Sequence, residues 1–199
     1  MAEKLLQSVD QEPTLHDESN VNPHWTACVT ASRKYLDPKD KACFFAPDMH
    51  KRHRWVDAQA LCVALNGSLA TFRNASQLID IAKEFQDYFR YDPGDAFAYK
   101  DWDGDAWVGA TQLYPYRAIS APKQGWRFLD GRAVNFGWDA GQPDGGFGGE
   151  SCLVFKFATT RQTRTGFDDL FCDLSPGKPH HWFAPNGLYS LCKLPHLLT

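Results

Sequence analysis

The chain has 199 residues and a mass of 22.5 kDa, which fits one domain with a sizeable hydrophobic core. Its net charge of -3 gives no electrostatic case for nucleic-acid binding, and no run approaches the ~18 apolar residues that span a bilayer. We therefore expect no nucleic-acid partner and no membrane span. Seven Trp and fourteen Phe predict a compact aromatic core.

Residues 1–24 are polar and acidic, and they predict a flexible N-terminal tail in front of a single domain at 25–199. The tail lacks the apolar core of a signal peptide. An even number of cysteines and two glycosylation sequons, at Asn66 and Asn74, nevertheless favour an oxidising, secretory environment. We expect a secreted protein whose native signal peptide is absent from this chain. Because short sequons also occur by chance, glycosylation of either Asn stays open.

The chain alternates between helix-like and strand-like patterns. Short aromatic-flanked pieces at 25–45 predict a hairpin, and apolar residues at three- and four-residue spacing predict a helix over 55–65 that Asn66-Gly67 ends. A second helix is expected over 76–89. Short strands are expected around 107–110, 152–157 and 189–194, which gives an α+β layout. Residues 175–187, rich in Pro and Gly, have the composition of an insertion of open role.

Oxygen-bearing side chains gather near two cysteines in the C-terminal half. Gln142-Pro143-Asp144 is followed by Glu150, two residues before Cys152, and Asp168-Asp169 precede Cys172. Calcium takes roughly six to eight oxygen ligands, commonly from flexible loops. No Gly-x-Ser-x-Gly elbow or other nucleophile with its base accompanies these oxygens. The pattern indicates a calcium-held recognition site without catalytic residues.

These motifs occur in the order found in a known family. Three further segments fit it: Trp107-Val108-Gly109-Ala110, residues 126–131 (Trp-Arg-Phe-Leu-Asp-Gly) and residues 135–141 (Asn-Phe-Gly-Trp-Asp-Ala-Gly). With the six cysteines, the chain over about 28–194 resembles the C-type lectin-like domain, and more narrowly its galactose-type members, in which Gln-Pro-Asp carries sugar choice. The resemblance implies two helices and two small antiparallel sheets with long calcium-binding loops.

Six cysteines allow fifteen pairings, and the sequence alone does not choose among them. The absence of a C-x2-C pair gives zinc little support. The resemblance to the family's three-disulfide long form implies Cys28–Cys43, Cys62–Cys192 and Cys152–Cys172.

The resemblance also implies the ligands of one calcium ion, with a cis peptide bond before Pro143. The implied metal ligands are Gln142, Asp144, Glu150, Asp168 and Asp169. An auxiliary second ion is not expected, because three of its ligand positions hold residues without a carboxylate: Gly145, Ser151 and Gln112.

The sugar site implied by the resemblance shares most of these residues. It comprises Gln142, Asp144, Glu150, Asp168 and Phe147. Gln-Pro-Asp goes with galactose or N-acetylgalactosamine in the family, and Glu-Pro-Asn with mannose. Two departures stand out: Asp168 replaces the usual Asn and so lacks an amide donor, and glycines stand where galactose binders commonly have a Trp. Phe147 substitutes for that Trp or anchors the loop, and both readings stay open.

We therefore expect a calcium-dependent lectin without enzymatic activity that recognises terminal galactose-type glycans on glycoproteins or cell surfaces. Weak single-site affinity would rise by multivalency if the protein forms a homo-oligomer. The alternative is a lectin-like module that binds a protein partner, as adhesion or toxin subunits do. A glycan-acting enzyme is a third, weaker possibility, since carboxylates that ligate an ion are lost to acid–base work.

Overall fold

The computed structural model of the protein describes residues 26–47, 51–86, 88–89, 105–113, 124–145, 149–158, 165–173 and 187–195. Three expectations lie outside these residues: those for the tail at 1–24, for Phe147 and for the insertion over 175–186.

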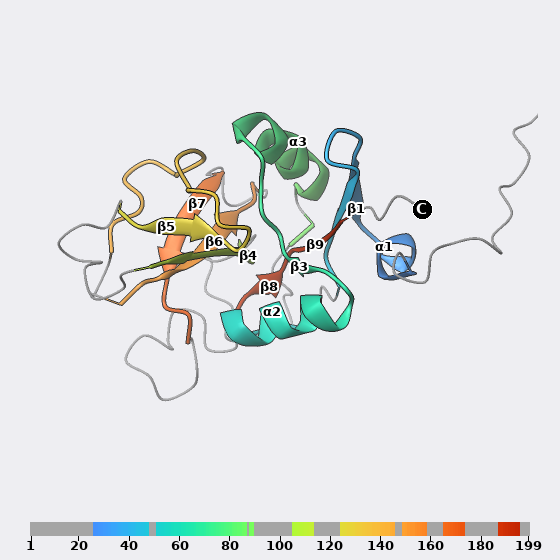
Figure 1. The fold of residues 1–199 in the computed structure, drawn as a ribbon, viewed down its shortest axis with the longest axis horizontal. Helices are drawn as coiled ribbons and strands as arrows, with labels where there is room; N and C mark the ends of the chain where they lie inside the picture. Colours follow the sequence, from blue (N-terminus) through green and yellow to red (C-terminus); the bar gives the residue numbers. More distant parts are fainter. Residues whose placement is uncertain are drawn as a thin grey trace, which may run out of the picture.

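Helices and two antiparallel sheets make up the described chain (Figure 1), which confirms the predicted α+β class. The helices are α1 (Thr26–Thr30), α2 (Trp55–Ala64) and α3 (Ala75–Phe85). The strands are β1 (Lys34–Asp37), β2 (Ala42–Phe45), β3 (Ser68–Leu69), β4 (Asp105–Gln112), β5 (Trp126–Phe128), β6 (Cys152–Lys156), β7 (Gly166–Leu170), β8 (Tyr189–Ser190) and β9 (Cys192–Pro195).

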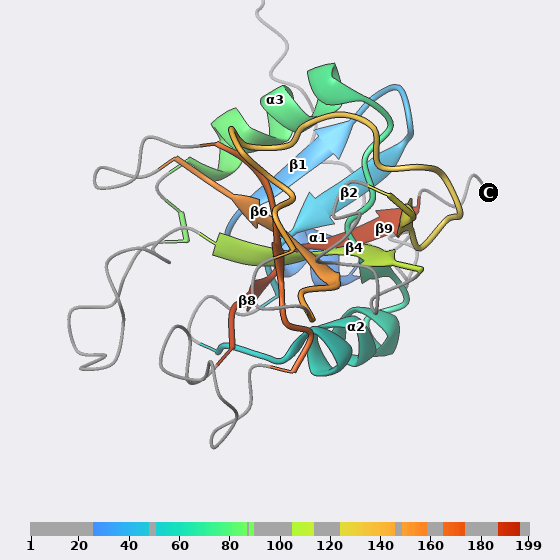
Figure 2. The same cartoon turned by 90° about the vertical axis from the view of Figure 1, so that its left-hand side faces the viewer.

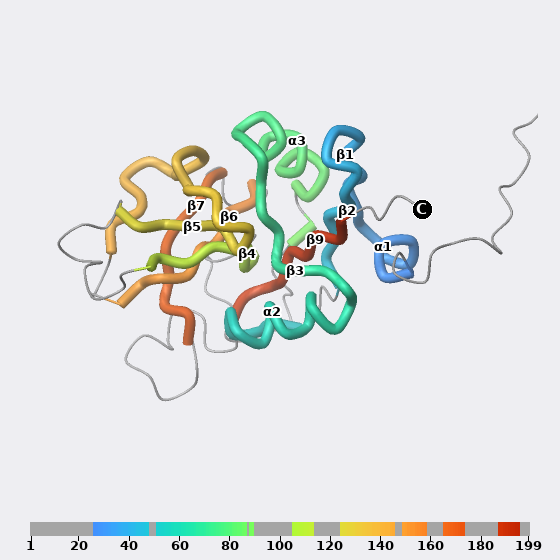
Figure 3. Tube along the Cα trace, viewed as in Figure 1, coloured from blue at the N-terminus to red at the C-terminus, as the bar shows by residue number. Residues whose placement is uncertain are grey.

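The first sheet joins the two ends of the described chain. Its strand order is β1-β2-β9-β3, so the last strand lies between the early β1–β2 hairpin and β3 (Figure 3). Cys28–Cys43 ties α1 to β2, and Cys62–Cys192 ties α2 to β9. Both pairs are those that the resemblance implied. The short helix α1, which contains two threonines and a valine, escaped the sequence analysis because β-branched residues are weak helix formers.

The second sheet carries the candidate site. Its order is β5-β4-β6-β7, and β8 pairs with β4 in parallel. Helices α2 and α3 lie on opposite sides of the strands (Figure 2). Helix α2 confirms the helix predicted over 55–65, and its Trp55 indole donates to the Val108 carbonyl at 2.9 Å, which anchors it to β4. Asn66, with a positive φ of 64°, ends it.

Helix α3 ends earlier than predicted, at Phe85 instead of residue 89. It begins at Asn74, an exposed residue whose side chain accepts the Gln77 N–H at 3.0 Å. The chain leaves the helix at Gln86 and turns so that Phe89 stacks on Phe85, with ring centroids 5.7 Å apart. The ring centroids of Phe89 and Phe157 are 5.0 Å apart. Burial of these rings outweighs another helical turn, since each aromatic side chain buries a large apolar area.

The strand predicted over 189–194 is two strands. Tyr189–Ser190 pairs with the second sheet and Cys192–Pro195 with the first, and Leu191 lies between them. The Leu191 N–H donates to the Trp107 carbonyl at 3.2 Å, and its own carbonyl accepts from Ala70 at 2.8 Å. The chain therefore crosses from one sheet to the other at this buried residue.

The core between the sheets is aromatic, as the composition predicts. Phe72, fully buried, has the rings of Phe44, Phe155, Phe167 and Phe128 around it at centroid distances of 5.5–6.2 Å. Among the residues that the structure describes, none of the helices has the length and apolar character needed to cross a bilayer.

Candidate calcium site

The site is built at the edge of the second sheet, on strand β7. This strand pairs with β6 in antiparallel register, with Val154 opposite Asp168 and Leu153 opposite Asp169. Sequence analysis placed the two adjacent carboxylates on a loop, whereas both lie on the strand. Cys152–Cys172 links the start of β6 to the residues after β7, as the resemblance implied, and holds this end of the sheet together.

The segment that contains Gln-Pro-Asp runs along the other edge of β7. The Phe167 N–H donates to the Gly137 carbonyl at 2.6 Å, and the Asp139 N–H donates to the Phe167 carbonyl at 2.9 Å. Gly137 has a φ of 80°, and a Cβ there would stand 2.8 Å from the Phe167 ring. A glycine is therefore needed for this close approach.

Further along, backbone donors of the same segment bind a side chain of β7. The N–H groups of Asp144 and Gly145 donate to the Asp169 carboxylate at 3.1 and 2.9 Å. These two bonds fix the loop, and with it the side chain of Asp144, beside the strand. Gly145 has a positive φ of 65°, a conformation that favours glycine.

Three of the five predicted metal ligands come together. Each of Asp144, Glu150 and Asp169 offers a carboxylate oxygen, and these oxygens all lie within 4.8 Å of one another. Glu150 and Asp169 are buried, and Asp144 is exposed to solvent. The Ser151 N–H donates to the Leu170 carbonyl at 3.0 Å, which places Glu150 next to the end of β7.

Gln142, another predicted ligand, has an amide oxygen of the right kind. Its side-chain Oε1 is buried and has no hydrogen-bond partner within the described part of the chain. The Gln142–Pro143 peptide bond is cis. A buried amide oxygen without a donor is costly unless something supplies positive charge. Three converging carboxylates and an amide oxygen from the same loop segment are oxygen donors of the kind that calcium prefers, so the residues present fit this ion.

The raised pKa of Asp169 is consistent with a cation-binding site. Burial raises its pKa from the ordinary 3.8 to about 6, and the neighbouring carboxylates of Asp168 and Asp144 add to the rise. The N–H groups of Gly145 and Asp144 act in the opposite sense but do not cancel it. A divalent ion would favour the charged carboxylate and reverse this rise.

Asp168 stands apart from this group. Its Oδ2 is ion-paired with the ammonium of Lys156, and its Oδ1 accepts the Asp169 N–H at 2.9 Å. Burial by itself lowers the pKa of Lys156, but the Asp168 carboxylate, with Asp105 and Asp139, raises it above its usual value. Lys156 therefore remains charged inside the protein.

Sequence analysis missed Lys156 and its acidic neighbour Asp105. Lys156 lies in the apolar run Cys-Leu-Val-Phe-Lys-Phe, and Asp105 is opposite it in the β4–β6 register. Both residues are buried. A lysine within an apolar strand was the available signal, because a buried ammonium requires an acidic partner.

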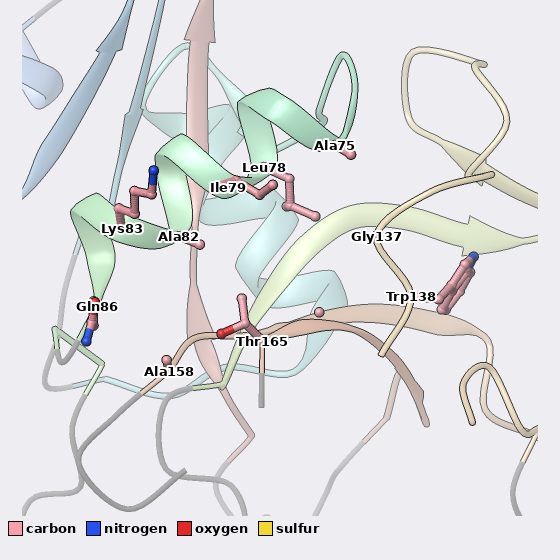
Figure 4. Close-up of a pocket in the computed structure, with 11 residues that line it drawn as sticks. Ala75, Leu78, Ile79, Ala82, Lys83, Gln86, Gly137, Trp138, Ala158 and Thr165 are labelled. Carbon is pink, nitrogen blue, oxygen red and sulfur yellow. The ribbon is translucent and has the colours of Figure 1, made fainter. Parts of the chain in front are cut away.

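A separate groove of about 370 Å³ lies between α3 and the segment that contains Gly137 and Trp138 (Figure 4). Leu78, Ile79 and Ala82 of α3 line one side, and Lys83 is the charged residue of its lining. None of the residues that line it, all of them in the described ranges, is acidic. The groove offers apolar contact without metal ligands and is distinct from the carboxylate cluster.

Solved structures with a similar fold include C-type lectin domains. The carbohydrate-recognition domain of the mouse scavenger receptor C-type lectin is 18% identical with a TM-score of 0.51, and the match covers 84% of this chain and 98% of that one. The cow CD23 domain, determined in the presence of GlcNAc2Man3 oligosaccharide, is 14% identical with a TM-score of 0.52, and the match covers 84% and 96%. The domain of murine dendritic cell inhibitory receptor 2, in complex with N-glycan, is 15% identical with a TM-score of 0.50, and the match covers 80% and 99%.

No protein-family model matches the sequence, and no curated protein is similar to it at a significant level. At these identities the structural matches establish the fold alone. The chain has a C-type lectin-like fold, as the sequence motifs implied.

Proposed function

We propose that this protein is a calcium-dependent carbohydrate-binding module. One observation carries the proposal: the oxygens of Asp144, Glu150 and Asp169 converge within 4.8 Å. The buried, unpartnered Oε1 of Gln142 supplies a further donor. A bound calcium ion would offer open coordination positions to two neighbouring hydroxyls of a sugar. Asp168, the fifth predicted ligand, is instead ion-paired with Lys156.

The sugar class we propose is terminal galactose or N-acetylgalactosamine. This rests on the resemblance of Gln142-Pro143-Asp144 to the galactose-type triplet. In the proposed arrangement the Gln142 amide donates to one sugar hydroxyl and the Asp144 carboxylate accepts from another. Binding of a glycan of some kind is supported by two neighbouring structures, of which the murine receptor domain is in complex with N-glycan and the cow CD23 domain was determined in the presence of an oligosaccharide.

We place the protein outside the cell. Three disulfides among the described residues support this, because such bonds persist in oxidising environments. We propose no catalytic activity: the clustered carboxylates would serve as metal ligands, which removes them from acid–base work.

Calorimetric titration with calcium tests the metal site, and a glycan array run with calcium and with chelator tests the sugar. We expect one calcium per chain, lost in Asp169→Asn. The matched control is Asp130→Asn, an exposed aspartate that is paired with Arg132 after β5. Control binding should equal that of the unaltered protein. Absence of calcium binding in the unaltered chain would refute the proposal, whereas binding of mannose alone would refute only the galactose assignment.

A protein-binding module is the second candidate, and one observation favours it. Asp168 corresponds to a ligand position of the C-type lectin-like family, but its carboxylate is ion-paired with the ammonium of Lys156. A site that has a lysine as counter-charge needs calcium less than one with free carboxylates. Binding of a protein partner that persists in chelator would support this candidate over the lectin.

A further inference from the structure

Lys156 has an unusual position for a charged residue. It lies on β6 opposite Gly166, two residues along from the Val154–Asp168 pair, so Lys156 and Asp168 share a face of the ladder as diagonal neighbours. Their side chains are only 11% and 6% exposed. Burying an ammonium or a carboxylate is strongly unfavourable without a partner. Each of the two residues therefore provides the counter-charge that allows the other to be buried.

Both oxygens of Asp168 are engaged in this arrangement. Oδ2 faces the Lys156 ammonium and Oδ1 faces the Asp169 N–H. A calcium ion bound through Asp168 would stand close to the ammonium, and like charges repel strongly where water is excluded. The three carboxylates that converge within 4.8 Å belong to other residues: Asp144, Glu150 and Asp169.

We propose that Lys156 is a built-in counter-cation that withholds Asp168 from the calcium site. The inference rests on the proposed function, since it concerns the ligands of that ion. It implies that calcium is held by Gln142, Asp144, Glu150 and Asp169. Because calcium affinity follows the number of charged ligands, Lys156 sets a weaker affinity than the sequence motif suggests. It also stabilises the metal-free fold by neutralising Asp168.

Replacing the lysine tests the proposal. Lys156→Met keeps the length of the side chain and removes its charge, which frees Asp168 for the ion. We expect calcium affinity, measured by calorimetry, to rise about tenfold, which corresponds to ~1.4 kcal/mol. The melting temperature in chelator should fall, and the rise on adding calcium should grow. The melting temperature in chelator measures how much Lys156 stabilises the fold when no metal is bound.

Two further variants identify the cause. Lys193→Met is the matched control, because Lys193 is also partly buried and faces an aspartate, Asp40, but lies on β9 of the other sheet. It should leave calcium affinity unchanged. In the double variant Lys156→Met with Asp168→Asn, the gain should shrink, since the freed carboxylate is its source. A gain that persists in full would overturn the proposal.

The double variant also covers the case in which Lys156→Met alone fails to fold with or without calcium, because it removes both charges of the buried pair and leaves no unpaired ammonium beside the ion. If Lys156 withholds Asp168, calcium affinity should stay within about threefold of the unaltered protein. A tenfold or greater loss would show that Asp168 ligates the ion and would overturn the inference. So would unchanged or weaker calcium binding by folded Lys156→Met.

The proposed function can fail separately. Calcium binding by Lys156→Met together with none by the unaltered chain would uphold the inference and refute a calcium-dependent function. Binding by neither folded protein would refute both.

Discussion

The metal-free protein should lose stability as the pH rises through the titration of Asp169. This carboxylate is 2% exposed, and burial raises its pKa from 3.8 to about 6 in the folded chain. The folded state therefore holds a proton more tightly than the unfolded state does. The difference between the two pKa values corresponds to ~3 kcal/mol of unfolding free energy.

The direction follows from which state holds the proton. Below pH 3.8 both states are protonated at Asp169, and the contribution to stability is fully present. Between about pH 4 and about pH 6 the unfolded chain has released its proton while the folded chain keeps it, so the unfolding free energy falls as the pH rises. Saturating calcium should remove this loss, because the ion stabilises the charged carboxylate.

Urea unfolding followed by tryptophan fluorescence, in chelator and in calcium, measures the effect from about pH 4 to about pH 7. Asp169→Asn isolates it, because the amide does not titrate, and its single oxygen still accepts one of the two N–H groups that the carboxylate binds. In chelator, the unaltered chain should lose ~3 kcal/mol relative to this variant over the range. The reasoning is refuted if the difference between the two proteins is independent of pH or has the opposite sign.

Three further predictions concern the core, the disulfides and the sugar. Phe72→Ala should lower the unfolding free energy by ~3–5 kcal/mol in chemical denaturation, because the ring is fully buried among four others; a loss below ~1 kcal/mol would contradict the packing. Non-reducing peptide mapping should recover Cys62 joined to Cys192, and a Cys62–Cys152 pair would reject the fold. Gln142→Glu with Asp144→Asn should shift preference toward mannose by roughly ten- to hundredfold in competition assays, and equal inhibition of the unaltered protein by galactose and mannose would disprove the galactose assignment.

Local patterns sufficed for part of the fold. The apolar spacing over 55–65 and the Asn66-Gly67 stop define α2 well, because a helix face and its end are both properties of nearby residues. The sequence analysis predicted an end of α3 at residue 89, beyond Phe85, because Phe89 fits the same helical spacing as Phe85. Its packing against Phe157 comes from a distant strand, and no local pattern contains that contact.

Strand β7 shows why the site itself was harder to predict. Gly166-Phe-Asp-Asp-Leu170 has two adjacent aspartates, which are depleted in strands, and reads as a loop. Pairing with β6 and the ion pair to Lys156 override that preference. The resemblance implied Asp144, Glu150 and Asp169 as ligands, but the engagement of Asp168 depended on a lysine that no motif includes.

The charge balance around β7 links these observations. Asp168 is ion-paired with the ammonium of Lys156, and its charge also interacts with that of Asp144. The carboxylate oxygens of Asp144, Glu150 and Asp169 lie within 4.8 Å of one another. Burial raises the pKa of Asp169, and repulsion by the carboxylates of Asp168 and Asp144 adds to the rise. A divalent ion among these oxygens would offset their mutual repulsion. Without Lys156, Asp168 would add a buried negative charge that has no counter-charge in this ion pair. The fold accommodates an aspartate at position 168 because Lys156 forms that pair with it.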